Sequence, residues 1–453
     1  MRKFMRSNFS AFVYSILAFA LIAFSGVPAF AADSVEYVER SVDANGNVVS
    51  QTRTATKYTQ VTSTTKNWQD SNWYCAMGKI SINSKVTVSG DVHLILKKGC
   101  TLTATEGIHV REGSSLTIYG QPDGDGKLIA TGYSGQAGIG GSNGDPHNAP
   151  ITITIHGGNI QATGGGGGAG IGCAGLLPSS ITIYGGTVSA DGGTNSAGIG
   201  GGYEAVRPII NIYGGSITAT GGQNGAGIGG GFDTNPVASA NQPGTINIYG
   251  GTITATGGKL VHVSGYSDLS QRYAAGIGGG HRTLYYTVNI YGGNITASRY
   301  DYHNGYGIRG QITLSYRNAG DSIYATNYGG TVTVADGKTF IVDGTEINGT
   351  LEIIKEEVST SPTEVLVFDT CPAIDGKTLT PQSSYKVNIG TTGITASTAK
   401  AFTGETVTLS PAEGYTLTGI TVDGAAITGN TFTMPAKDVT VTGTAETVHK
   451  TVF

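Results

Sequence analysis

The sequence predicts an all-β protein: a right-handed parallel β-helix, a solenoid with about 28 residues per coil, followed by a small β-sandwich module. Three observations predict it. A short motif recurs along the middle of the chain, apolar residues alternate with a period of two, and 73 of the 453 residues are glycine. The glycines follow no three-residue period, which excludes collagen, and the ordered apolar alternation argues against disorder.

Five repeat units align in the middle of the chain. They are ITIHGGNIQATGG from 153, ITIYGGTVSADGG from 181, INIYGGSITATGG from 210, INIYGGTITATGG from 246 and VNIYGGNITASRY from 288. A second motif, AGIG, lies between them at 137–140, 169–172, 197–200, 226–229 and 275–278. The HGG/YGG motif advances by 28, 29, 36 and 42 residues, so we interpret the first two spacings as bare coils and the later ones as coils with insertions.

Each unit contains three short runs of period two, separated by glycine-rich corners. In the unit from 210, alternation places Ile210, Ile212, Ile217, Ala219 and Ile228 on one side. A four-residue strand cannot bury its apolar side alone, but three such strands per turn, stacked turn on turn, make one continuous interior. The handedness rule for parallel crossover connections favours right-handed winding.

The chain divides by composition into six segments. Residues 1–31 have the charged start, apolar run and Ala29-Phe30-Ala31 site of a secretory signal peptide, so we expect a secreted or cell-surface protein without a membrane span in the mature chain. We expect a cap or hairpin over 32–78, the β-helix over 79–355, a Ser/Thr/Pro-rich linker over 356–383, the sandwich module over 384–446 and a tail over 447–453.

Composition also limits the partners and cofactors. The net charge is −4, and no basic field exists to hold nucleic acid. The cysteines lack the spacing of a metal site, and the GAGIGGG loops lack the following Lys-Ser/Thr of a phosphate loop, so we expect no metal and no cofactor. Cys75 and Cys100 are the cysteines nearest in sequence; an exported chain could join them by a disulfide, and buried free thiols are the alternative.

The motifs resemble known bacterial proteins. VTVSGDVHLILKKGCTLTATEGIHV, SLTIYGQ and the ATGG…AGIGGG units resemble right-handed β-helix surface proteins of gut Firmicutes, described as carbohydrate-binding-domain proteins. Residues 385–446, with ETVTLSP, EGY and NTFTMPA, resemble the divergent internalin-type bacterial repeat, an extracellular spacer. The wall-sorting motif that often ends such proteins does not occur in this sequence. The resemblance implies an extracellular protein of a Gram-positive bacterium that binds carbohydrate.

An aromatic row is the first candidate binding surface. One aromatic residue follows the repeated strand in each coil, at Tyr119, His156, Tyr184, Tyr213, Tyr249 and Tyr291. In register, the rings would repeat at roughly the 4.8 Å spacing of paired strands. Exposed aromatic rings suit contact with sugar faces. The alternative is that the stacked rings only stabilise neighbouring coils.

The longest insertions, within 265–317, are the second candidate. They depart from the Gly/Thr composition around them, and insertions on solenoids often form the binding surface. The candidate ligand-binding residues are Tyr273, His281, Arg282, Tyr285, Tyr300, Asp301, Tyr302, His303, Tyr306 and Arg309. A cap over irregular coils is the alternative interpretation of this segment.

The sequence therefore predicts a binding or adhesion protein whose partner is a glycan or another ligand on host or neighbouring cells. No catalytic residues are assigned, because paired carboxylates of the kind that glycosidases need are lacking in the regular coils. Two alternatives remain open. One is a polysaccharide-active enzyme, a lyase or glycoside hydrolase, that uses Asp301, His303 and His281; the other is a passive structural stalk.

Overall fold

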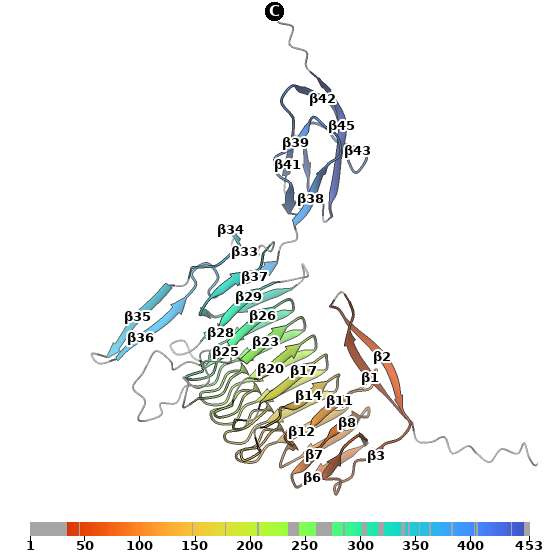
Figure 1. The fold of residues 1–453 in the computed structure, drawn as a ribbon, viewed down its shortest axis with the longest axis vertical. Helices are drawn as coiled ribbons and strands as arrows, with labels where there is room; N and C mark the ends of the chain where they lie inside the picture. Colours follow the sequence, from red (N-terminus) through yellow and green to blue (C-terminus); the bar gives the residue numbers. More distant parts are fainter. Residues whose placement is uncertain are drawn as a thin grey trace, which may run out of the picture.

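A computed structural model describes residues 34–447 except 45, 147, 177, 206–207, 234–243, 260–273, 284–285, 301–305, 316–320, 337–339, 343–344, 353, 362–363, 382–383, 403, 405 and 436. Within these residues all regular structure is β, and most of it forms three long sheets that wind around one axis (Figure 1). Each coil contributes one strand to each sheet, and successive coils pair in parallel. The right-handed parallel β-helix is confirmed.

The first sheet carries the predicted aromatic row, and we call it the ladder sheet. Its strands are β3 (Thr59–Gln60), β5 (Asn72–Ala76), β8 (Asp91–Leu96), β11 (Ser115–Tyr119), β14 (Ile151–Ile155), β17 (Ser179–Ile183), β20 (Ile209–Ile212), β23 (Gly244–Ile248), β26 (Tyr286–Ile290), β29 (Gln311–Leu314) and β32 (Val332–Val334).

The second sheet, which we call the threonine sheet, presents Thr-rich outer rows. Its parallel strands are β6 (Lys79–Ile82), β9 (Thr101–Ala104), β12 (Lys127–Thr131), β15 (Asn159–Thr163), β18 (Thr187–Asp191), β21 (Ser216–Thr220), β24 (Thr252–Thr256), β27 (Asn294–Ser298) and β30 (Ser322–Ala325). Three antiparallel strands extend it, in the order β37 (Thr378–Pro381), β33 (Phe340–Val342) and β34 (Thr345–Ile347).

The third sheet, which we call the glycine sheet, contains the strands made by the AGIG motifs. Its strands are β4 (Asn67–Gln69), β7 (Val86–Ser89), β10 (Ile108–Val110), β13 (Ile139–Gly140), β16 (Ile171–Gly172), β19 (Ile199–Gly200), β22 (Ile228–Gly229), β25 (Ala275–Gly278), β28 (Tyr306–Arg309) and β31 (Tyr328–Gly329).

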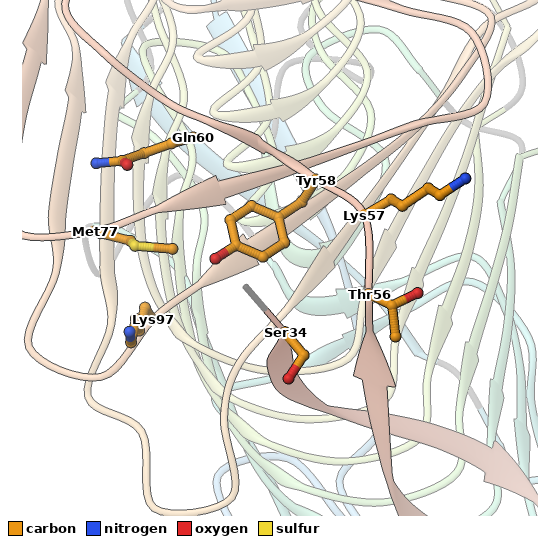
Figure 2. A pocket seen from close by; sticks show the side chains of 7 residues that line it. All are labelled: Ser34, Thr56, Lys57, Tyr58, Gln60, Met77 and Lys97. Atoms are coloured by element: carbon orange, nitrogen blue, oxygen red, sulfur yellow. The ribbon is translucent and has the colours of Figure 1, made fainter. Parts of the chain in front are cut away.

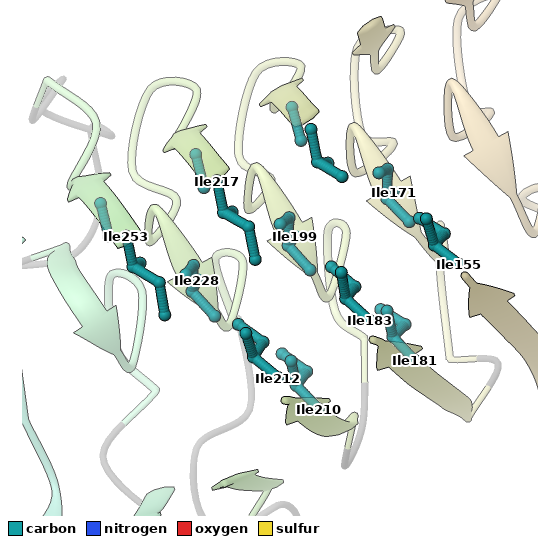
Figure 3. Packing of buried hydrophobic residues seen from close by; sticks show 14 of the residues in the cluster. Ile155, Ile171, Ile181, Ile183, Ile199, Ile210, Ile212, Ile217, Ile228 and Ile253 are labelled. Atoms are coloured by element: carbon teal, nitrogen blue, oxygen red, sulfur yellow. The ribbon is translucent and has the colours of Figure 1, made fainter. Parts of the chain in front are cut away.

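The interior is a set of aliphatic columns, one per inward position. Ile153, Ile181 and Ile210 pair in register on the ladder sheet, with spacings of 28 and 29 residues. Ile171, Ile199 and Ile228 form the matching column on the glycine sheet, and the side chains of the columns meet inside the coils (Figure 3). Because every coil buries its apolar side only against its neighbours, the repeat itself produces the core.

Backbone conformation explains the invariant glycine that ends each short strand of the glycine sheet. Gly172 and Gly200 have φ of +139° and +127°, and a Cβ there would lie 2.0 and 2.2 Å from the carbonyl oxygen of the next coil. No side chain fits at such a distance, so only glycine lets adjacent coils approach. The column of these glycines runs from Gly140 to Gly278 and is bounded by His109 and Arg309 at the same register position.

The N-terminal segment forms a hairpin beside the solenoid rather than only a cap over its end. β1 (Val35–Val42) pairs antiparallel with β2 (Val48–Ala55), and the hairpin lies along the flank of the first coils (Figure 1). The coils begin with β3 at Thr59, inside the region 32–78 that we expected to precede them. Trp68 is fully buried in the interior of this first coil.

The expected linker over 356–383 contains ordered strands. β35 (Ile354–Ser361) and β36 (Glu364–Thr370) form a two-stranded sheet. After it, Cys371, Ile374 and Leu379 are fully buried in the β-helix core, and β37 pairs with β30 and β33. The segment from 371 to 381 therefore closes the C-terminal end of the solenoid.

The C-terminal module has two sheets over its own core, which confirms the small β module. One sheet contains β40 (Lys400–Phe402), β38 (Ser384–Ile389), β45 (Val439–Thr447), β42 (Tyr415–Val422) and β43 (Ala425–Ala426). The other contains β39 (Ile394–Ala396), β41 (Thr406–Pro411) and β44 (Thr431–Thr433). Val407, Leu409, Met434 and Val441 are among the residues that pack between them.

Candidate functional site

The predicted aromatic row is present as one continuous stack. The ring centroids of successive members, from Tyr119 through His156, Tyr184, Tyr213 and Tyr249 to Tyr291, lie 4.5 to 5.0 Å apart, and the ring planes differ by only 5 to 10°. The in-register pairing of the ladder-sheet strands imposes this spacing. The stacking is confirmed, while a role in ligand binding stays a prediction.

Stacking also decides which part of each ring a ligand can touch. In the interior of the row, both faces of a ring such as Tyr213 lie against neighbouring rings. Tyr184, Tyr213, Tyr249 and Tyr291 remain partly exposed, so what they present outward is ring edge and phenol oxygen. Flat stacking of a sugar on an open ring face, the contact suggested by the sequence, does not fit the inner rings of this geometry.

A second row runs beside the aromatic one on the same outer face. Asn211, Asn247 and Asn289 are in register. Asn247 donates its Nδ2 hydrogen to Asn211 Oδ1, and Asn289 donates its own to Asn247 Oδ1, both at 2.9 Å. Thr154 and Thr182 occupy this row in the earlier coils. The repeated motif I-N-I-Y is the sequence signal of this row.

The outer face is uncharged from β14 to β26. Its outward residues along the strands are Thr152, Thr154, Ser180, Thr182, Ile209, Asn211, Thr245, Asn247, Thr287 and Asn289. Together with the aromatic row, the face offers hydroxyl, amide and phenol groups at the spacing of the coils. Such a surface can form many weak hydrogen bonds with a neutral, hydroxyl-rich ligand.

The hairpin covers the beginning of this face. The Tyr37 ring packs 4.8 Å from Trp73 and 4.7 Å from Tyr119, between centroids, and Val38 donates its backbone N–H to the Gly120 carbonyl at 2.9 Å. Under the hairpin, the row occupied by tyrosine elsewhere holds Cys75 and Ile95, both fully buried. This row is thus apolar where the hairpin covers it and aromatic from Tyr119 onward.

Arg40 of the hairpin marks the boundary between the covered and the open parts. Its backbone N–H donates to His156 Nδ1 at 2.9 Å, and its guanidinium donates to the His156 carbonyl. The side chain lies over the corners at Gly157 and Gly185, where a Cβ would come within 2.9 Å of Nη1 and 3.1 Å of Nε. His156 is only 7% exposed, and burial lowers its pKa to about 4.

The second candidate, the insertions within 265–317, is described only in part. Tyr273, Tyr285, Asp301, Tyr302 and His303 lie outside the described residues. Tyr300 is 59% exposed and Arg282 partly exposed, the latter with φ of +63°. The existence of one site here, and the enzyme alternative built on Asp301 and His303, stay predictions.

Three of the described candidates in this segment are buried. His281 packs its ring edge-to-face on Phe232, with centroids 4.8 Å apart. Tyr306 and Arg309 belong to β28, where the Arg309 guanidinium lies 5.1 Å from the Tyr306 ring centroid. The parallel register with β25 places both in the wall of the solenoid, which gives them a packing contact.

Buried His109 pairs with partly exposed Asp145 near the first AGIG coil. His109 Nε2 is 2.9 Å from Asp145 Oδ2, and Ser142 donates its backbone N–H to the same oxygen at 2.8 Å. Burial opposes ionisation of Asp145, but these hydrogen bonds outweigh it and lower the pKa of the carboxyl. His109 Nδ1 is buried with no hydrogen-bond partner among the described residues. The pair links β10 to the loop that carries Asp145.

A small hollow lies at the base of the hairpin, next to the first coils (Figure 2). It has a volume of about 500 Å³ and is lined by Ser34, Thr56, Lys57, Tyr58, Gln60, Met77 and Lys97. Sequence patterns gave no sign of it, because its lining comes from the hairpin, the first coil and the corner after β8. Tyr58 and Met77 also pack against the cluster that holds the hairpin to the ladder sheet.

The possible disulfide does not form in the structure. All four cysteines are free and buried. Cys75 belongs to the cluster under the hairpin, on the outside of the ladder sheet, whereas Cys100 belongs to the interior core. Burial raises the pKa of Cys75 to about 11 and also raises that of Cys100, which keeps both as thiols.

The described part of the chain lacks two further features. No group of three or more His, Cys, Asp or Glu side chains there is placed to hold a metal ion. No helical segment there has the length and hydropathy needed to span a bilayer.

Comparison with known families identifies the coils. The model of the beta helix repeat family matches residues 123–143, 153–175, 181–203, 210–232 and 246–281. These segments are the most regular coils, and the match agrees with the parallel β-helix of the structure. Comparison with the curated proteins and with the solved structures gives no match.

Proposed function

We propose that this chain is an extracellular carbohydrate-binding protein that contacts its glycan on the open ladder face, between β17 and β26. The supporting observation is the pair of parallel rows on that face: partly exposed tyrosines stacked 4.5 to 5.0 Å apart, and beside them asparagines linked by hydrogen bonds. A glycan presents repeated hydroxyl groups and apolar C–H edges, which phenol oxygens, amides and ring edges complement. The β-helix repeat is compatible with a surface or binding protein.

The rows are rigid before any ligand arrives. Each tyrosine is held by its neighbours and each asparagine by its row, so few side-chain rotamers remain to be ordered on binding. Repetition along four coils then lets individually weak contacts add up along one chain of sugars. We propose the exposed Tyr300 and the insertions around it as a second contact region for the same ligand, a glycan on the surface of host or neighbouring cells.

A glycan array with the full chain tests the proposal. The variant Tyr213→Phe/Tyr249→Phe keeps the ring stack but removes two phenol hydroxyls, and we expect its affinity to fall about thirtyfold, at roughly 1 kcal/mol per hydrogen bond. Thr218→Val/Thr254→Val, on the threonine sheet of the same coils, is the matched control and should bind like the wild type.

Three outcomes would count against this assignment. A blank array for the wild type would favour a protein ligand or a structural stalk. Equal binding by wild type and the phenylalanine variant would remove the ladder from the site. Loss of binding in Tyr300→Ala, with unchanged binding in the phenylalanine variant, would place the site in the insertions.

A further inference from the structure

Arg40 is the charged group at the N-terminal border of the open ladder face, and the Asp321 carboxylate lies at the opposite end, at the Gly292 corner after Tyr291. The open ladder face carries no charged side chain along its outward rows from β14 to β26. Arg40 reaches it from the hairpin and lies over Gly157 and Gly185, the corners that follow His156 and Tyr184. A ligand that lies along the open tyrosines therefore contacts this guanidinium at the end of the face nearest the N-terminal coils.

The guanidinium has unused hydrogen-bonding capacity. Its side-chain hydrogen bond in the described structure goes to a neutral acceptor, the His156 carbonyl. No carboxylate of the described residues lies within ion-pair distance of Arg40, whereas Arg53 on the same hairpin pairs with Glu39 at 3.1 Å. Arginine has five N–H donors in a planar fork, so a pair of anionic oxygens can still be bound.

The surroundings of Arg40 strengthen such a contact. Arg40 is partly buried between the hairpin and the coils but still reaches solvent, and burial lowers its pKa. A charge in this position interacts more strongly with an opposite charge than one in bulk water does. The His156 side chain accepts the Arg40 backbone N–H through Nδ1, and this contact fixes the segment that carries the guanidinium.

We propose that the glycan bound by the ladder face is acidic, and that Arg40 receives the carboxylate or sulfate oxygens of one of its sugars while the neutral part follows the Tyr and Asn rows. This inference rests on the proposed function. Arg40 would then determine both the class of glycan and the position at which its acidic sugar lies along the coils.

Matched oligosaccharides test it on the full chain. The probes are a uronic acid tetrasaccharide, the same compound with its carboxyl groups reduced to hydroxymethyl groups, and a sulfated tetrasaccharide without carboxyl groups. The wild type should bind each acidic probe roughly tenfold or more tightly than the reduced one, since hydrogen bonds to charged groups exceed neutral ones in strength. That preference should weaken at high salt.

Two variants assign the preference to Arg40. Arg40→Met keeps the aliphatic stem over Gly185, and Arg40→Gln keeps some polarity; both should lose the preference while still binding the reduced probe. Arg53→Gln is the matched control and should keep it. The readout is the ratio of the two affinities, and Trp73 fluorescence shows whether the hairpin stays docked on Tyr119.

The outcomes separate the two proposals. Equal binding of acidic and reduced probes by the wild type would overturn the acidic-glycan inference and leave the proposed function standing. An unchanged ratio in Arg40→Met with a docked hairpin would remove Arg40 from the site. Absence of binding to any glycan would overturn both. Tight binding of only one acidic probe would support the inference and identify the anionic group.

Discussion

One backbone position in each AGIG coil, at the end of the short strand of the glycine sheet, accepts only glycine. At Gly200, φ is +127° and a Cβ would lie 2.2 Å from the Gly229 carbonyl oxygen. We expect Gly200→Ala to destabilise the β-helix by about 3 kcal/mol or more, since backbone strain and overpacking act together. Chemical denaturation monitored by circular dichroism measures the change.

Gly78 supplies the control for this substitution. Its φ is +70°, but nothing lies within 4 Å of a Cβ placed there. Gly78→Ala should therefore cost only the left-handed backbone penalty, about 1 to 2 kcal/mol. Equal stability of the two variants would show that close approach between coils is not what fixes glycine at position 200.

At the scale of elements, attachment of the hairpin to the ladder sheet depends on a neutral histidine. His156 Nδ1 accepts the Arg40 N–H, and burial lowers the pKa of His156 to about 4 from the ordinary value of 6.5. Protonation removes the acceptor and places two cations together. The contribution of neutral His156 to hairpin docking is therefore fully present above pH 6.5 and is lost as the pH falls toward 4. Within this range the equilibrium constant for docking falls by up to tenfold per pH unit.

Tryptophan fluorescence reports this change, because Trp73 contacts the hairpin residue Tyr37 while the other tryptophan, Trp68, is buried inside the coil. We expect the Trp73 signal to change between pH 6.5 and 4 before the coils unfold. His156→Tyr, which restores the residue type of the later coils, should flatten this profile. The same profile in both proteins would show that His156 is not the group responsible for it.

At the scale of the molecule, the chain consists of two separately cored units. The C-terminal module buries its own residues, and the segment 371–381 belongs to the solenoid through Cys371, Ile374 and Leu379. We expect a chain that ends at 383 to keep the thermal transition of the β-helix unchanged. A chain that ends at 370 should melt several degrees lower, because the last coils lose the buried residues that cover them.

Calorimetry of both truncated chains makes the comparison, with the full chain as reference. The full chain should show one additional transition from the module. Equal melting of the two truncated chains would mean that the segment 371–381 is dispensable, as a plain linker would be.

Much of the fold could be read from local pattern. The period-two alternation and the recurrence of IYGG and AGIG predict strands of four or five residues, and their spacing predicts the coil length. The strand register then aligns Tyr184, Tyr213 and Tyr249 without further information. Sequence reasoning was less successful with the ends of the solenoid, where the repeat decays and single contacts replace the pattern.

The repeat alone is enough to specify the architecture and the aromatic row, because it propagates every local preference from coil to coil. Which part of the row stays open depends instead on long-range packing, since Tyr37, Val38 and Arg40 contact coils far along the chain. Long-range packing also decided that ring faces are occupied by other rings, that Cys75 and Cys100 lie on opposite sides of the wall, and that Tyr306 and Arg309 are buried. These outcomes depend on contacts between distant segments, which no local periodicity encodes.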